Sequence, residues 1–222
     1  MLGLMQNHPL LISSLIDFAA RHHGDGEIVS RRVEGDIHRY TWADVQQRAK
    51  QVANAIDALG LKAGDRIGTL AWNGYRHLEL YFGVSGSGRV LHTVNPRLLP
   101  EQIAWILNHA EDQALCFDMS FLPIIQGIHA HCKTVRHWIA LCDADKLPAD
   151  TGIPNLISYE AWLGSQSPDY EWPVFDESTA SSMCYTSGTT GNPKAALYSH
   201  RSTVLHAYAA SLPDVMRLSA RD

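Results

Sequence analysis

Apolar residues recur with helical spacing over residues 41–59, the most regular segment of the chain. This apolar face consists of Val45, Ala49, Val52, Ala53, Ile56 and Leu59. Thr41 and Asp44 have the spacing of a capping box, in which each side chain binds a free backbone amide at the start of a helix. Gly60 follows, at a position where glycine commonly ends a helix. The pattern predicts a helix over 41–59.

Short apolar runs alternate with helical segments along the following part of the chain. The apolar runs predict strands at 66–72, 89–94, 114–118 and 135–141. Helices are expected between them at 76–85, 100–109 and 122–131, and an earlier helix at 11–22 precedes a hairpin made by 27–30 and 38–40. This repetition predicts an α/β fold, with a mostly parallel sheet flanked by helices on both faces.

A proline-rich stretch at 143–176 separates this region from the end of the chain. We interpret it as a connector that crosses from one sheet to another, so that a short strand at 181–185 starts a second sheet. A further strand at 195–199 and a helix at 201–211 follow. The expected organisation is an N-terminal α/β subdomain with its connector at 1–175, and the beginning of a second α/β subdomain at 176–222.

Composition narrows the class of protein. The chain has 222 residues, 45% of them hydrophobic and 18% charged, with a formal net charge of −5, which is typical of a globular protein. The acidic balance excludes a general nucleic-acid binder, because the chain has no basic surface to neutralise phosphates. No stretch of 18 apolar residues indicates a transmembrane helix. The four cysteines are irregularly spaced, which favours reduced, mostly buried thiols and a cytoplasmic location.

The residues 185–194 combine the properties of a phosphate-binding loop. Gly188 and Gly191 let the backbone approach an anion closely, and successive backbone amides in such a turn form an anion-binding nest. Lys194 adds a positive charge. Hydroxyl donors come from Thr186, Ser187, Thr189 and Thr190. The loop is not a Walker A motif, because no Gly-Lys pair precedes a serine or threonine.

The string from Tyr185 to Lys194 resembles the signature of the adenylate-forming superfamily, Tyr/Phe-Thr-Ser-Gly-Ser/Thr-Thr-Gly-x-Pro-Lys-Gly. Three more segments are similar to its acyl-CoA synthetase branch, and specifically to medium- and long-chain fatty-acyl-CoA ligases: 65–73, 91–98 and 197–202. The resemblance covers nearly the whole chain. It implies the large N-terminal domain of an AMP-forming fatty-acyl-CoA synthetase, in which ATP activates a fatty acid to an acyl-adenylate and CoA then displaces AMP.

The resemblance also implies roles for the loop. Thr186, Ser187, Gly188, Thr189, Thr190, Gly191 and Lys194 would hold the β- and γ-phosphates of ATP. Thr190 would lie near Mg²⁺. The implied partners are a fatty acid, ATP and CoA, and a homodimer is plausible on the same basis.

Two features depart from the family pattern. Ala195 stands where the family usually has glycine, which would cost on the order of 1 kcal/mol if that position needs a positive φ. The chain also ends before the family's adenine, ribose and C-terminal-domain motifs. We therefore expect an incomplete large N-terminal domain that lacks the C-terminal domain and is inactive in acyl-CoA synthesis by itself.

Other candidate sites are weaker. His129, His131 and Cys132 do not share a helical face, so a metal site is disfavoured. For His200 and Arg201, approach to phosphate is the less favoured of two alternatives, the other being a structural role. Trp72 and Trp105 are expected in the core. The leading function is the fatty-acyl-CoA ligase; the alternative is a non-catalytic nucleotide-binding or pseudo-enzyme module, and a P-loop NTPase is disfavoured.

Overall fold

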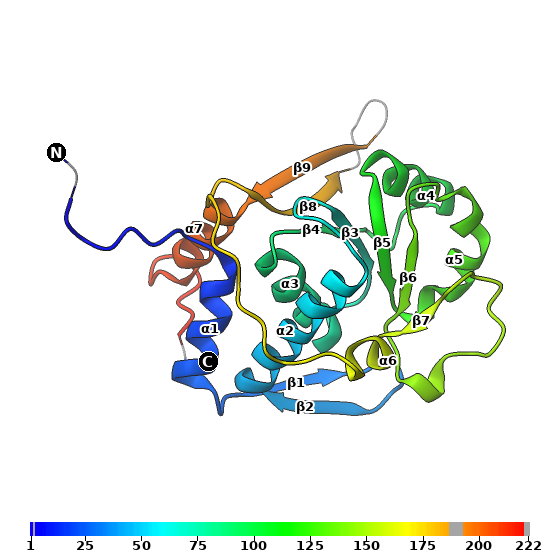
Figure 1. Cartoon of the computed structure of the whole chain (residues 1–222), viewed down its shortest axis with the longest axis horizontal. Coiled ribbons are helices and arrows are strands. Elements are labelled where there is room, and N and C mark those ends of the chain that lie inside the picture. Colours follow the sequence, from blue (N-terminus) through cyan, green and yellow to red (C-terminus); the bar gives the residue numbers. More distant parts are fainter. Residues whose placement is uncertain (2, 187–192, 220–222) are drawn as a thin grey trace.

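A seven-stranded sheet forms the centre of the protein (Figure 1). The computed structural model describes residue 1, residues 3–186 and residues 193–219. In spatial order the strands are β7 (Ile157–Ser158), β6 (His137–Ala140), β5 (Asp112–Phe117), β3 (Arg66–Leu70), β4 (Val90–Thr93), β8 (Ala180–Thr186) and β9 (Lys194–Ser199). Neighbouring strands are parallel except β8 and β9, which are antiparallel.

Helices cover both faces of this sheet. The helices of the described residues are α1 (Ile12–His23), which packs on α2 and α3, α2 (Trp42–Ala58), α3 (Tyr75–Gly86), α4 (Pro100–His109), α5 (Leu122–Ile128), α6 (Tyr159–Gly164) and α7 (His200–Ser211), with short 3-10 turns at Met119–Phe121, His129–His131 and Ala144–Lys146. Side chains alternate along β5, so that Leu115 and Phe117 pack with α4 and α5 while Ala114 and Cys116 pack with α2, α3 and α6. Figure 1 shows α4 and α5 on one side of the sheet and α2 and α3 on the other. The predicted α/β fold class is confirmed.

A separate hairpin joins α1 to α2. It consists of β1 (Glu27–Arg31) and β2 (Ile37–Thr41), paired antiparallel, and Gly35 in its turn has a φ of 102°. The predicted capping box is present at the start of α2. Thr41 N donates to Asp44 Oδ2 at 2.8 Å, and Asp44 N donates to Thr41 Oγ1 at 3.3 Å. Gly60 follows the helix with a φ of 74°, as its predicted role requires.

The prediction of a second sheet is wrong. β8 pairs in parallel with β4, with Leu91 opposite Ser182 and Thr93 opposite Cys184, so the strand before the loop extends the same sheet. The physical reason is that the connector returns to the open edge of β4 and does not cross to a new layer. The stretch at 143–176 also contains β7 and α6, whose Tyr159 is fully buried. The subdomain boundary at 175/176 stays a prediction.

The two tryptophans expected in the core, Trp72 and Trp105, differ in burial. Trp105 is partly buried and packs against the core. Trp72 is 50% exposed, so its expected burial is wrong. It follows the end of β3 at the edge of the sheet, where its Nε1 donates to Ser120 Oγ at 2.9 Å. An apolar run therefore continues past the strand without entering the core.

A buried ion pair and a hydrogen bond join three of the helices. The Glu79 side chain is 0% exposed and accepts hydrogen bonds from Arg48 Nε at 2.7 Å and Tyr159 OH at 2.8 Å. These contacts join α2, α3 and α6. A buried carboxylate is tolerated only when it is paired and hydrogen-bonded, as Glu79 is.

Arg76 on α3 extends this network. Its guanidinium donates to Glu34 in the hairpin turn at 2.8 Å, to Asp143 after β6 at 2.6 Å and to Glu160 on α6 at 2.9 Å. One buried side chain thus joins three segments that are distant in sequence.

Three cysteines are buried, Cys184 is partly buried and all four are free thiols, as expected. Over the described ranges, none of the helices is long and apolar enough to cross a membrane.

The close packing of α2 on α3 leads to a stability prediction for Gly83. A Cβ at this position would lie 2.6 Å from Val52 Cβ and 2.7 Å from the Ala49 carbonyl oxygen. We expect Gly83→Ala to lower the free energy of unfolding by about 2 kcal/mol, because the two helices must move apart. Urea denaturation measures this change.

Gly127→Ala is the matched control, because a Cβ at Gly127 on α5 meets nothing within 4 Å. Alanine there is expected to leave stability unchanged or raise it by about 0.5–1 kcal/mol. Equal stability of the two variants would contradict the packing of α2 on α3.

Candidate functional site

The antiparallel strands β8 and β9 bring the two ends of the predicted phosphate-binding loop together. Thr186 is the partner of Lys194 in the strand register, and Thr186 Oγ1 donates to the Lys194 carbonyl oxygen at 3.4 Å. Both residues are exposed. The other predicted site residues, Ser187, Gly188, Thr189, Thr190 and Gly191, lie outside the described residues.

The position of these ends within the sheet suits a ligand site. β8 runs parallel to β4, so Thr186 lies at the edge where the carboxyl ends of the parallel strands meet. Ligands of open α/β sheets bind outside this edge. Thr186 and Lys194, which are both exposed, therefore lie where an anionic ligand has access.

Ala195 fits its place without backbone strain. It lies within β9 opposite Tyr185. Among the described residues, the non-glycine residues with positive φ are Glu111, Asn155 and Arg217, so Ala195 is outside the left-handed region. The predicted cost of replacing glycine at this position does not arise in this extended backbone.

Tyr185, the residue before Thr186, is anchored by two histidines. Its hydroxyl forms a hydrogen bond with His109 Nδ1 at the end of α4, at 2.6 Å. Its ring lies 5.2 Å from the ring of His92 on β4, centroid to centroid. Burial raises the pKa of Tyr185. The strand that leads to Thr186 is thus held by its side chain as well as by its backbone.

A buried histidine–aspartate pair lies beside Tyr185. His92 on β4 and Asp112 on β5 are both 0% exposed, and His92 Nδ1 lies 2.6 Å from Asp112 Oδ2. Burial raises the pKa of Asp112, and the hydrogen bond with His92 acts in the opposite direction. The pair spans β3, which separates the two strands.

Gly68 lies on β3, between the two strands that carry this contact. It is the partner of His92 in the strand register, and a Cβ at Gly68 would lie 2.8 Å from Leu115 Cδ1 and 3.4 Å from Asp112 Oδ2. A glycine inside a strand often marks such a close approach. Sequence reasoning missed His92, Asp112, His109 and Gly68, although a histidine and a glycine within short apolar strands were available signals.

His200 and Arg201 have structural partners. His200 is 0% exposed, and Ile12 N donates to its Nδ1 at 3.1 Å, which attaches α1 to α7. Arg201 forms an ion pair with Glu177, whose carboxylate also accepts the backbone amide of Leu10 at 2.7 Å. Of the two alternatives for His200 and Arg201, these contacts support the structural one.

The described residues do not form a metal site. Within these ranges, no group of three or more histidine, cysteine, aspartate or glutamate side chains is placed to hold an ion. His129 Nδ1 lies 3.0 Å from the Gln126 carbonyl oxygen, and Cys132 Sγ donates to the Ile128 carbonyl oxygen at 3.4 Å. The predicted Mg²⁺ contact of Thr190 falls outside the described residues. Thr186 and Lys194 supply a hydroxyl and an amine, which are not the carboxylates that Mg²⁺ prefers.

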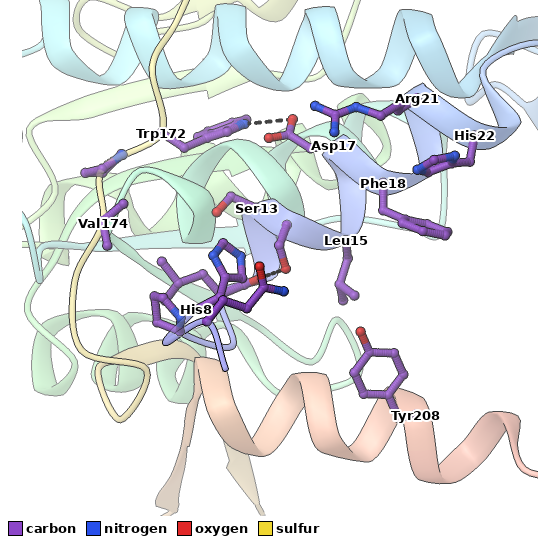
Figure 2. Close-up of a pocket in the computed structure, with 15 residues that line it drawn as sticks. His8, Ser13, Leu15, Asp17, Phe18, Arg21, His22, Trp172, Val174 and Tyr208 are labelled. Carbon is purple, nitrogen blue, oxygen red and sulfur yellow. Dashed lines mark hydrogen bonds between the residues drawn. The ribbon is translucent and has the colours of Figure 1, made fainter. Parts of the chain in front are cut away.

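A groove of about 680 Å³ lies elsewhere, between α1, the segment 172–174 and Tyr208 of α7 (Figure 2). Asp17 on its wall accepts hydrogen bonds from Trp172 Nε1 at 3.2 Å and Gln46 Nε2 at 2.7 Å. This carboxylate is therefore occupied in holding the connector against α1. No predicted site residue lines the groove.

The chain is similar in sequence to known AMP-binding enzymes. The family model described as AMP-binding enzyme matches residues 16–222. The chain is 51% identical over its whole length to 3-methylmercaptopropionyl-CoA ligase of Ruegeria lacuscaerulensis, and 49% identical to medium-chain-fatty-acid–CoA ligase of Ectopseudomonas oleovorans. It spans 41% and 40% of these relatives, respectively.

A solved structure supports the fold. The Mycobacterium tuberculosis fatty acyl CoA synthetase superposes with a TM-score of 0.73 at 23% identity, covering 92% of this chain and 38% of that one. At this identity the similarity concerns the fold alone.

His200 gives a prediction for the dependence of stability on pH. Burial lowers its pKa from 6.5 to about 4 in the folded chain. The unfolded chain therefore binds the proton at a higher pH, so this contribution is complete above about pH 6.5 and is lost as the pH falls toward 4. We expect the loss to reach roughly 3 kcal/mol.

The test is His200→Asn, in which an amide oxygen that does not titrate replaces Nδ1 as acceptor. Between pH 7 and pH 4, the free energy of unfolding of this variant should fall by less than that of the unmodified chain. His131→Asn, at an exposed position, is the control and should leave the pH dependence unchanged. Identical pH profiles for His200→Asn and the unmodified chain would contradict a buried neutral His200.

Proposed function

The chain belongs to the AMP-binding enzyme family, and we propose on this premise that it supplies the ATP-phosphate-binding part of a fatty-acyl-CoA synthetase. In the proposed reaction, a fatty-acid carboxylate attacks the α-phosphate of ATP, which forms an acyl-adenylate and releases pyrophosphate. The thiol of CoA then attacks the acyl carbon and releases AMP. The fatty acid, ATP and CoA are the proposed substrates.

The observation that carries the proposal is the pairing of Thr186 with Lys194 at the carboxyl edge of the sheet. Lys194 would neutralise charge on the β- and γ-phosphates, and the hydroxyl of Thr186 would donate to their oxygens. We assign the same phosphate-binding role to Ser187, Gly188, Thr189, Thr190 and Gly191. Positioning and charge neutralisation are the main means of catalysis in such phosphate chemistry.

The choice of acid rests on the relatives. Medium-chain and long-chain fatty-acid–CoA ligases match at 49% and 44% identity, which supports a fatty acid. The 51% identical relative is described as a 3-methylmercaptopropionyl-CoA ligase, so a short thioether acid is the second candidate. Both acids present a carboxylate on an apolar chain, and they would enter the same reaction.

Further proposals concern the setting of this reaction. We propose Mg²⁺ bound with ATP, a cytoplasmic location, no nucleic-acid partner and a homodimer. The chain spans about 40% of its curated relatives, and we propose that its 222 residues alone do not form acyl-CoA. The alternative function is a nucleotide-binding module without catalysis, which would bind ATP and never supply an acyl-adenylate.

Nucleotide binding by the 222-residue chain tests the role of Lys194. We expect Lys194→Ala to weaken binding of MgATP about tenfold or more, because a charge-assisted contact to phosphate is lost. Binding of AMP, which lacks the β- and γ-phosphates, should be unchanged. Isothermal titration calorimetry measures both affinities.

Lys146→Ala is the matched control, because this exposed lysine lies in the 3-10 turn between β6 and β7, toward the opposite edge of the sheet from β9. Its removal should leave MgATP binding unchanged. The phosphate-binding role of Lys194 would be refuted if both lysine variants bound MgATP equally well, or if the unmodified chain bound none.

A further inference from the structure

We propose that His109 and the buried His92–Asp112 pair are positioning residues for Thr186 and Lys194, the two ends of the phosphate-binding loop, and that they act on them through Tyr185. This inference rests on the proposed function, because it gives those residues a task in nucleotide binding. All four side chains and both loop ends that they control, Thr186 and Lys194, belong to the described part of the chain.

The first step is the free-energy cost of burying the His92–Asp112 pair. Two polar side chains are buried completely in the sheet, and Asp112 Oδ1 and His92 Nε2 have no hydrogen-bond partner among the described residues. An apolar pair of similar volume is often at least as stable in such a place. Gly68 on β3 lies between the two strands that carry the pair, and a Cβ there would meet Leu115 Cδ1 at 2.8 Å. A buried polar pair that contributes little to stability, and that contacts Tyr185, is expected to serve positioning.

The second step is the contact with Tyr185. The His92 ring lies beside the Tyr185 ring, at 5.2 Å and tilted by 46°. His109 holds the phenol hydroxyl at 2.6 Å, and Trp105 stacks on the His109 ring at 4.6 Å with an interplanar angle of 21°. Tyr185 is therefore fixed at its ring by β4 and at its hydroxyl by α4.

The third step links Tyr185 to the two described ends of the loop. Tyr185 is the register partner of Ala195, and Thr186 is the partner of Lys194. A shift of one residue between β8 and β9 would move every side chain to the opposite face of the sheet. Holding Tyr185 in place thus keeps Thr186 paired with Lys194 at the carboxyl edge of the sheet.

Four variants test this chain of contacts. Tyr185→Phe removes the hydroxyl and keeps the ring, and His109→Ala removes its partner. We expect each to weaken MgATP binding about fivefold, the effect of one hydrogen bond, and to leave AMP binding unchanged. The double variant should be no weaker than either single one, because both remove the same contact. His109→Asn, whose amide oxygen replaces Nδ1, should restore most of the affinity.

Tyr198→Phe is the matched control on β9. Among the described residues, its hydroxyl has a long contact of 4.0 Å with Cys184 Sγ, and we expect unchanged MgATP binding. The positioning role is overturned if Tyr185→Phe and Tyr198→Phe behave alike, if the effects of Tyr185→Phe and His109→Ala add fully, or if His109→Asn fails to recover binding that His109→Ala loses.

Hydrogen–deuterium exchange supplies a readout that does not depend on ATP. In the ligand-free chain, Tyr185→Phe and Asp112→Asn should speed exchange in the peptides that cover β8 and β9, and leave α2 unchanged. Unchanged exchange in β8 and β9 overturns the inference. If exchange responds as expected but Lys194→Ala binds MgATP normally, the proposed function fails while the anchoring of Tyr185 stands.

Discussion

The parallel pairing of β8 with β4 is the interaction on which the position of the candidate site depends. It joins residues separated by about ninety positions in the chain, Leu91 with Ser182 and Thr93 with Cys184. Because β8 enters the sheet here, its last residues reach the carboxyl edge and Tyr185 lies beside His92. The antiparallel return of β9 then places Lys194 opposite Thr186. Without this pairing Thr186 and Lys194 would have no fixed relation to the rest of the sheet.

Local sequence signals account for most of the fold. The helix at 41–59 and its capping box follow from periodicity and from two side chains three residues apart, and α4 occupies the predicted residues 100–109. The prediction of a second sheet is wrong because β8 pairs with the open edge of β4. No local sequence pattern indicates which edge a strand will join. Helix α6 was missed because it is short and lies among prolines, although burial of Tyr159 and its bond to Glu79 fix it firmly.

The candidate site also has one part that the sequence predicts and one part that it does not. The loop residues stand in one continuous string, so their chemistry could be recognised from the sequence. The residues that support the loop ends could not be recognised in this way. Gly68, His92, Asp112 and His109 come from three strands and a helix, and they are brought together only when β4 and β5 flank β3. His200 illustrates the reverse case. It follows the loop closely in sequence, yet the fold turns it inward to accept the amide of Ile12.

The most direct measurement is acyl-CoA formation by a chimera in which residues 1–222 replace the matching 41% of Ruegeria lacuscaerulensis 3-methylmercaptopropionyl-CoA ligase. With ATP, CoA and either 3-methylmercaptopropionate or a medium-chain fatty acid, we expect acyl-CoA and AMP from the chimera. We expect strongly reduced product from the same chimera carrying Lys194→Ala, and none from the 222-residue chain alone. A chimera that unfolds as cooperatively as the parent ligase, yet forms no acyl-CoA from either acid, would contradict the proposed function.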